Sequence, residues 1–129
     1  SGKAFMAREG CFDELDCALS WHPGSTNMIG NSSTLANCQA YFRFTGVSSH
    51  AAISPHLGRS ALDAAELTNV GVQFLREHII PEARIHYAIT DAGGNAPNVV
   101  QPKAAVLYLM RAPDNVTLAD IYARVTRIA

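Results

Sequence analysis

The stretch "KAAVLYLMR", residues 103–111, decides the expected fold. Its apolar residues occupy both faces of an extended chain until Arg111, whereas a strand at a solvated surface alternates apolar and polar residues. The length and pattern predict a central strand of a sheet. Pro113 and Asp114 follow and end the strand, because proline fixes its backbone and donates no hydrogen bond.

Two half-buried strands flank this central strand in the expected sheet. In "RIHYAIT", residues 84–90, the apolar side chains alternate with polar ones. The same alternation runs through "NCQAYFRFTG", residues 37–46, where Cys38 and Phe42 share one face and Gln39 and Arg43 share the other. A period of two is typical of a strand with one face on a core and one face in water.

Two amphipathic helices complete the pattern. The first is predicted from about Arg59 to His78, with Ser60 as a candidate N-cap. It carries one apolar stripe for the core and a second apolar stripe formed by Leu67, Val70 and Phe74. The second stripe predicts that the helix contacts more than its own sheet. The second helix, "TLADIYARVTRIA", is expected to begin with Asn115 or Thr117 near its cap. We expect one face of this helix, with Leu118, Ile121, Tyr122 and Val125, to point toward the core.

The order strand, helix, strand, strand, helix predicts an α+β domain over residues 34–129. We expect a ferredoxin-like two-layer sandwich, with an antiparallel sheet and both helices on one face. That topology requires one more strand after the second helix, and the chain ends before it. Residues 1–33 are predicted to be the end of a different, α/β domain. They comprise the end of a helix (2–9), a short buried strand (15–21) and the linker "PGSTNMIGNSST", residues 23–34.

The composition narrows the functional class. Of 129 residues, 48% are hydrophobic and 16% charged, which is ordinary for a globular domain and argues against disorder. The net charge of −1 provides no basic surface for nucleic acid and no attraction to an anionic membrane. The three cysteines, Cys11, Cys17 and Cys38, form no CxxC motif; we expect small core residues and a reducing cytoplasm.

The five histidines form no known metal or catalytic spacing by themselves. His50 and His56 lie in a loop before a helix, a position where functional residues concentrate. An isolated loop histidine is more often incidental than catalytic. Residue patterns alone therefore leave a globular α+β domain without an assigned chemistry.

Three stretches together resemble the M20 family of metallopeptidases and amidohydrolases. They are "FTGVSSHAAISPHLGRSALDAA" (44–65), "NAPNVVQPKAAVLYLMR" (95–111) and, upstream, "FDELDCALSWHP" (12–23). The resemblance implies the lid, or dimerisation, domain of a metal-dependent enzyme that cleaves the amide bond of an N-acyl amino acid. The implied substrate is p-aminobenzoyl-glutamate, cleaved to p-aminobenzoate and glutamate. A homodimer through the lid domain is expected, and a second hydrolase subunit is left open.

The resemblance also implies roles for four residues. His50 matches the lid histidine that reaches into the partner's active site and stabilises the oxyanion. Asn98 and Arg111 match substrate-binding residues, and Arg111 would hold a carboxylate. His22 matches one metal ligand of the catalytic domain. The turn that carries Asn98, "NVVQP" (98–102), departs from the family pattern because Gln101 is inserted before Pro102.

A catalytic metal needs about three protein ligands, and His22 is the only one that the resemblance places in this chain. We therefore expect zinc or manganese in the full-length enzyme and no complete metal site here. The alternative is a non-catalytic ferredoxin-like module that binds a small molecule or dimerises.

Overall fold

The computed structural model describes residues 2–30 and 33–129, which form two units divided after residue 32. The first unit contains one short helix, α1 (Gly2–Arg8). Gly10 ends this helix with a positive φ of 75°, and the amide of Cys11 donates to the carbonyl of Met6 over 3.0 Å. This arrangement closes a helix C-terminus, as the sequence predicts.

The predicted buried strand over residues 15–21 is wrong. Residues 15–21 form no strand; Leu19 is 96% exposed and Trp21 is 85% exposed. A strand is stabilised by ladder hydrogen bonds to a neighbour, and no other described segment of this unit is extended beside it. Within the expected linker, residues 23–30 form neither helix nor strand, and residues 31–32 lie outside the described part of the chain.

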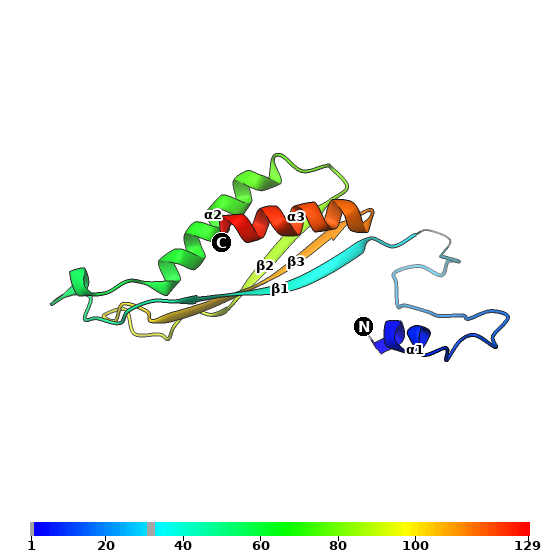
Figure 1. Ribbon diagram of the computed structural model, residues 1–129, viewed down its shortest axis with the longest axis horizontal. Coiled ribbons are helices and arrows are strands. Elements are labelled where there is room, and N and C mark those ends of the chain that lie inside the picture. The colour runs from blue at the N-terminus through cyan, green and yellow to red at the C-terminus, as the bar shows by residue number, and fades with distance from the viewer. Residues whose placement is uncertain (1, 31–32) are drawn as a thin grey trace. The chain divides into compact units, whose positions relative to one another are not determined.

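The second unit is built on a three-stranded antiparallel sheet with the order β1-β3-β2. The strands are β1 (Ala36–Thr45), β2 (Arg84–Asp91) and β3 (Lys103–Ala112). The central position predicted for residues 103–111 is therefore confirmed. Figure 1 shows the two long helices, α2 (Ala61–Arg76) and α3 (Asn115–Ile128), over the same face of this sheet. An α+β architecture with helices on an antiparallel sheet is thus established.

The two faces of β3 have different environments. Its even-numbered residues point toward the helices, and Val106, Tyr108 and Met110 are fully buried. Its odd-numbered residues point to the other face, which neither helix covers, and Leu107 and Leu109 are only partly buried there. We call this second side, with the odd-numbered residues of β1 and β3 and the even-numbered residues of β2, the open face. The apolar pattern of the central strand therefore extends onto a surface without a second layer.

Both long helices are capped by side chains. The Ser60 hydroxyl accepts a hydrogen bond from the amide of Asp63, which confirms its predicted role. The cap of α3 is Asp114, whose carboxylate accepts from the Thr117 amide over 2.8 Å. Asn115 is the first residue of the helix, so both residues predicted near the cap, Asn115 and Thr117, lie there. A carboxylate satisfies the free amides and also favours the positive end of the helix dipole.

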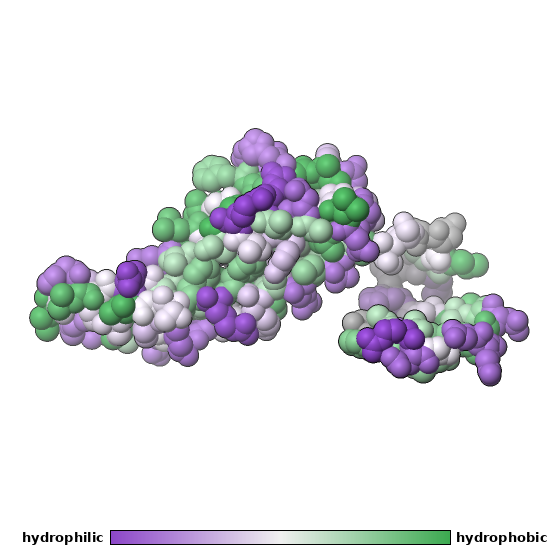
Figure 2. Space-filling view, viewed as in Figure 1, coloured by the Kyte–Doolittle hydropathy of each residue, from purple (hydrophilic) through white to green (hydrophobic). Residues whose placement is uncertain are grey.

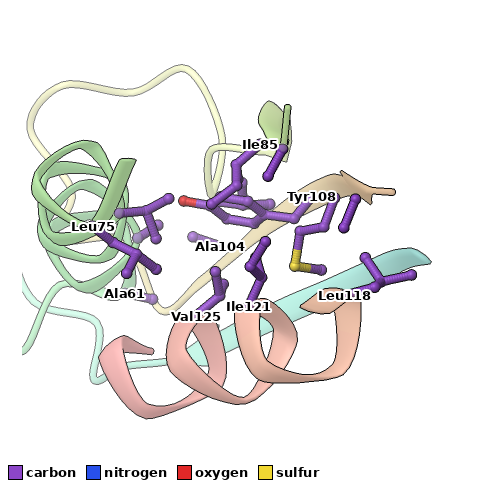
Figure 3. Close-up of a cluster of buried hydrophobic side chains, with 14 residues drawn as sticks. Ala61, Leu75, Ile85, Ala104, Tyr108, Leu118, Ile121 and Val125 are labelled. Atoms are coloured by element: carbon purple, nitrogen blue, oxygen red, sulfur yellow. The ribbon is translucent and has the colours of Figure 1, made fainter. Parts of the chain in front are cut away.

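The core is centred on Tyr108, which is drawn with its neighbours in Figure 3. Ile85 of β2, Leu75 of α2 and Ile121 and Val125 of α3 belong to the same buried cluster. The Tyr108 hydroxyl donates to the buried Asn69 side chain on α2 over 2.5 Å. This hydrogen bond satisfies two polar groups inside the core and ties α2 to the central strand.

The cysteine prediction is only partly right. Cys38 packs partly buried against the core cluster, but Cys11 and Cys17 are exposed. The two exposed thiols lie in the first unit, whose described residues include none that is buried. Neither of the two units, in its described residues, contains a helix long and apolar enough to cross a membrane.

Replacing Tyr108 by phenylalanine should lower the free energy of unfolding by about 2 kcal/mol at pH 7, because the Asn69 acceptor would stay buried without a partner. Burial, with a smaller contribution from Tyr87, raises the pKa of Tyr108 to about 12 from 10.0. The unfolded state therefore ionises first, and the wild-type advantage should shrink as the pH rises from 10 to 12. Urea unfolding from pH 7 to 12, with exposed Tyr122→Phe as control, measures both effects. A wild-type advantage that stays constant to pH 12 would contradict the assignment.

Candidate functional site

The loop that carries His50 is attached to a second loop far away in sequence. His50 forms an isolated β-bridge with Val99. Hydrogen bonds join the Ala51 amide to the Asn98 carbonyl over 2.9 Å and the Val100 amide to the Ser49 carbonyl over 2.9 Å. The loop 46–60 and the segment 97–102 therefore form one hydrogen-bonded unit at one end of the sheet.

The hydrogen bonds of the His50 ring define its protonation. The ring is exposed, and its Nδ1 accepts from the backbone amides of Ala52 over 3.2 Å and Ile53 over 3.3 Å. An atom that accepts from two N–H groups carries no proton, so the neutral ring holds its proton on Nε2. His50 thus presents an Nε2–H donor, which is the group needed to stabilise an oxyanion.

Asn98 is brought beside His50 by the same loop pairing. Its backbone carbonyl accepts from Ala51, the residue after the histidine, and its side chain is exposed. The carboxamide makes no hydrogen bond within the described residues. Two of the four predicted site residues, His50 and Asn98, therefore lie together and offer polar groups to a ligand.

Arg111 is not part of this group. It lies on the open face near the far end of β3, directly opposite Asn37 of β1 and Arg84 of β2. The Asn98 segment enters β3 at Lys103, eight residues before Arg111. Strand residues rise about 3.4 Å each, so the length of β3 separates Arg111 from the His50 loop by about 27 Å. One small substrate cannot contact both ends within a single copy of the domain.

His22 lies in the first unit, and its ring has the opposite tautomer. Nδ1 is 2.9 Å from the carbonyl oxygen of Pro23. Because a carbonyl only accepts, Nδ1 holds the proton and Nε2 keeps a free lone pair, the form in which histidine binds a metal. Across residues 2–30 and 33–129 there is no group of three or more His, Cys, Asp or Glu side chains that could hold a metal ion. The described residues therefore place His22 in the tautomer of a metal ligand but surround it with no complete metal site.

Sequence reasoning missed the close packing inside the His50 loop. A Cβ at Gly58 would lie 2.2 Å from the Ser49 Oγ, and a Cβ at Gly46 would lie 2.1 Å from the Arg59 carbonyl oxygen. The Ser49 hydroxyl is buried and has no hydrogen-bond partner among the residues that the structure describes. Both glycines are required because neighbouring atoms lie too close for a Cβ. In the sequence, this close packing was signalled only by the two glycines on either side of "SSH".

At the tip of the loop Ile53 and Leu57 are exposed, and Figure 2 shows hydrophobic side chains there.

Comparisons with known proteins concern the domain as a whole and not the individual site residues. Residues 35–129 match the M20_dimer family, the "Peptidase dimerisation domain". The whole chain is 59% identical to one of the subunits of the p-aminobenzoyl-glutamate hydrolase of Escherichia coli, and it covers 27% of that polypeptide. It is 33% identical to the Xaa-Arg dipeptidase of Mus musculus over 112 residues, which is 87% of this chain and 26% of that protein. The chain therefore spans about a quarter of the length of these relatives.

Solved structures show the same fold. An aminobenzoyl-glutamate utilization protein from Klebsiella pneumoniae superposes with a TM-score of 0.60 and 24% identity, over 73% of this chain and 24% of that one. An amidase of the hydantoinase/carbamoylase family from Burkholderia phymatum has a TM-score of 0.62 and 15% identity, over 73% of this chain and 24% of that one. At these identities the likeness concerns the fold alone.

Substitution of Gly58 by alanine should displace Ser49 and destabilise the protein by about 2 kcal/mol, because the added Cβ overlaps the hydroxyl. Thermal unfolding measures the loss. Ser49→Gly in the Gly58→Ala background removes the overlapping atoms and should recover part of it, while Gly30→Ala, with no neighbour within 4 Å, is the control. Equal stability of Gly58→Ala and the wild type would contradict the packing.

His50 and His22 should show opposite tautomers in long-range proton–nitrogen NMR spectra recorded with both rings neutral. His50 should carry its proton on Nε2 and His22 on Nδ1, because their Nδ1 atoms accept and donate hydrogen bonds respectively. The exposed His56 is the reference for a ring in water. A His50 spectrum identical to that of His56 would rule out a fixed tautomer.

Proposed function

The chain belongs to the M20 peptidase family through its dimerisation domain, and on that premise we propose that it is part of an amidohydrolase that cleaves p-aminobenzoyl-glutamate. Residues 34–129 are the lid domain, and residues 1–33 are the end of the catalytic domain and a linker. The products are p-aminobenzoate and glutamate. The 59% identity to the Escherichia coli hydrolase supports this substrate. That relative is named as one subunit of its enzyme, which supports a second kind of polypeptide in the assembly.

The observation that carries the proposal is the donor character of His50. Its Nε2–H faces outward because two backbone amides occupy Nδ1. In amide hydrolysis the carbonyl oxygen gains negative charge, and a donor already in place stabilises that charge. The exposed Asn98 carboxamide, held next to His50 by the loop pairing, supplies a second donor or orients the substrate. Both groups bind and stabilise; neither is a nucleophile.

The length of β3 supports a placement of Arg111 in a different active site from His50 of the same copy. Since about 27 Å separates the two ends of the strand, a substrate bound by both must lie between two copies. Each active site then uses His50 and Asn98 of one protomer and Arg111 of the other. Arg111 holds a substrate carboxylate, for which the planar guanidinium is suited.

The surface for the partner copy lies on α2 and β2. Leu67, Val70 and Phe74 are 71%, 52% and 65% exposed along one stripe of α2. Tyr87 and Ile89 of the edge strand β2 are exposed beside them. A contiguous exposed apolar patch of this kind is typical of an interface. In a ferredoxin-like topology a fourth strand pairs with β1, which leaves the β2 edge for the second copy.

In the whole enzyme the metal would be held by His22 together with ligands from outside the described residues. M20 enzymes are metal-dependent, and His22 has the free Nε2 of a ligand for zinc or manganese. The described residues do not supply the remaining ligands, so no reaction step through the metal is derived from them. The competing proposal is a non-catalytic module that only binds a small molecule or dimerises. An assay of amide hydrolysis distinguishes this module from the amidohydrolase.

The test is hydrolysis of p-aminobenzoyl-glutamate by the full-length protein, with His50→Ala compared with the exposed neighbour His56→Ala. His50→Ala should lower kcat by about 10²–10³, the effect of removing one oxyanion donor. His56→Ala should leave kcat unchanged. Wild-type protein that binds metal and dimerises without cleaving this amide would favour the non-catalytic module.

Mixing two inactive variants tests the sharing of sites. In a dimer of His50→Ala with Arg111→Ala, one site carries both defects and the other carries neither. Co-expression should therefore restore about a quarter of the wild-type activity, because about half of the dimers are mixed and one of their two sites is intact. Activity no higher than that of the separate variants would mean that each site takes both residues from one copy.

A further inference from the structure

Arg84 and Arg111 form a pair of guanidinium groups on the open face of the sheet. They are directly opposite each other in the β2–β3 register, and Asn37 continues the same row on β1. Both arginines are exposed. We propose that this pair binds the two carboxylates of a dicarboxylic amino-acid leaving group and so selects glutamate over uncharged side chains. The inference rests on the proposed function, in which Arg111 binds a substrate carboxylate and Arg84 has no role.

The charges around the pair favour an anionic ligand. Within the described residues, neither Arg84 nor Arg111 forms an ion pair with a carboxylate. The Asp114 carboxylate, close in sequence to Arg111, is engaged as the cap of α3 by the amide and hydroxyl of Thr117. Like charges directly opposite in an antiparallel pair destabilise a sheet. A bound dianion would remove that repulsion.

Hydrogen bonds from one nitrogen of the Arg84 guanidinium hold the side chain in position and leave its other N–H donors for a ligand. Its Nη1 donates to the carbonyl oxygens of Pro81 and Ala83, the latter over 2.7 Å. The Nε and Nη2 groups keep their donors for a ligand, because a guanidinium has five N–H donors. A side chain that is ordered before binding loses less conformational entropy when it binds. Arg84 is thus prepared for a carboxylate.

The spacing and the adjacent surface suit glutamate. Opposed residues of an antiparallel pair have Cα atoms about 4.5–5.5 Å apart, so the two guanidinium groups reach carboxylates separated by a short aliphatic chain. Next to the pair is a shallow depression of about 200 Å³, lined by Gln39, His86, Tyr87, Ala88, Leu107 and Leu109. Its mainly apolar floor can contact the methylene groups between the carboxylates.

The experiment compares two uncleavable ligands on the full-length, metal-loaded protein by isothermal titration calorimetry. They are N-(p-aminobenzyl)-glutamate and N-(p-aminobenzyl)-glutamine, in which a methylene replaces the scissile carbonyl and which differ only in the side-chain carboxylate. The wild type should bind the glutamate ligand about tenfold more tightly, as expected for one charge-assisted pair. Arg84→Gln should reduce that ratio to about one, and Arg84→Lys should retain part of it.

The matched control is Arg43→Gln, an exposed arginine on the same open face but near the opposite end of β1. It should leave the ratio unchanged, and circular dichroism checks that each variant is folded. A wild type that binds both ligands equally, or an Arg84→Gln protein that keeps the wild-type ratio, overturns the inference. Because neither ligand can be cleaved, this result is independent of whether the protein hydrolyses p-aminobenzoyl-glutamate.

Discussion

The rest of the domain depends on the burial of one side chain, Tyr108, at the centre of β3. Its ring packs edge-on against Phe42 of β1 with centroids 5.5 Å apart and lies 5.4 Å from the ring of Tyr87 on β2. Its hydroxyl donates to Asn69 on α2. The residue therefore joins all three strands and one helix. Any shift of β3 relative to α2 would leave the phenol and the amide buried without partners.

The position of β3 has a direct functional consequence. Because the strand runs across the full sheet, its first and last residues lie at opposite ends, with the His50 loop at one end and Arg111 at the other. The sheet thus acts as a rigid spacer between two sets of polar groups. In the proposed dimer this spacing distributes the groups over two active sites, so that each site is complete only when both protomers are present.

The chemistry of the site is set by short-range backbone contacts. His50 and His22 carry the same imidazole, yet two amides direct the proton of one ring to Nε2 and a carbonyl holds the proton of the other on Nδ1. In the proposed enzyme, the first ring is a donor for an oxyanion and the second is a ligand for a cation. The glycines around His50 allow this arrangement, because a Cβ at Gly58 would overlap Ser49 and a Cβ at Gly46 would overlap the backbone of Arg59.

The sequence by itself determined the elements with strong local patterns and the family. The apolar run 103–111 identified the central strand, the alternation in 84–90 identified an edge strand, and Ser60 identified the start of α2, since periodicity and caps are local properties. The strand expected at 15–21 failed because an apolar segment becomes a strand only beside a partner. Only the tertiary structure placed Asn98 beside His50, 48 residues earlier in the chain, and Arg84 opposite Arg111. Such neighbours result from strand register and loop pairing, which depend on contacts between segments and leave no trace in residue spacing.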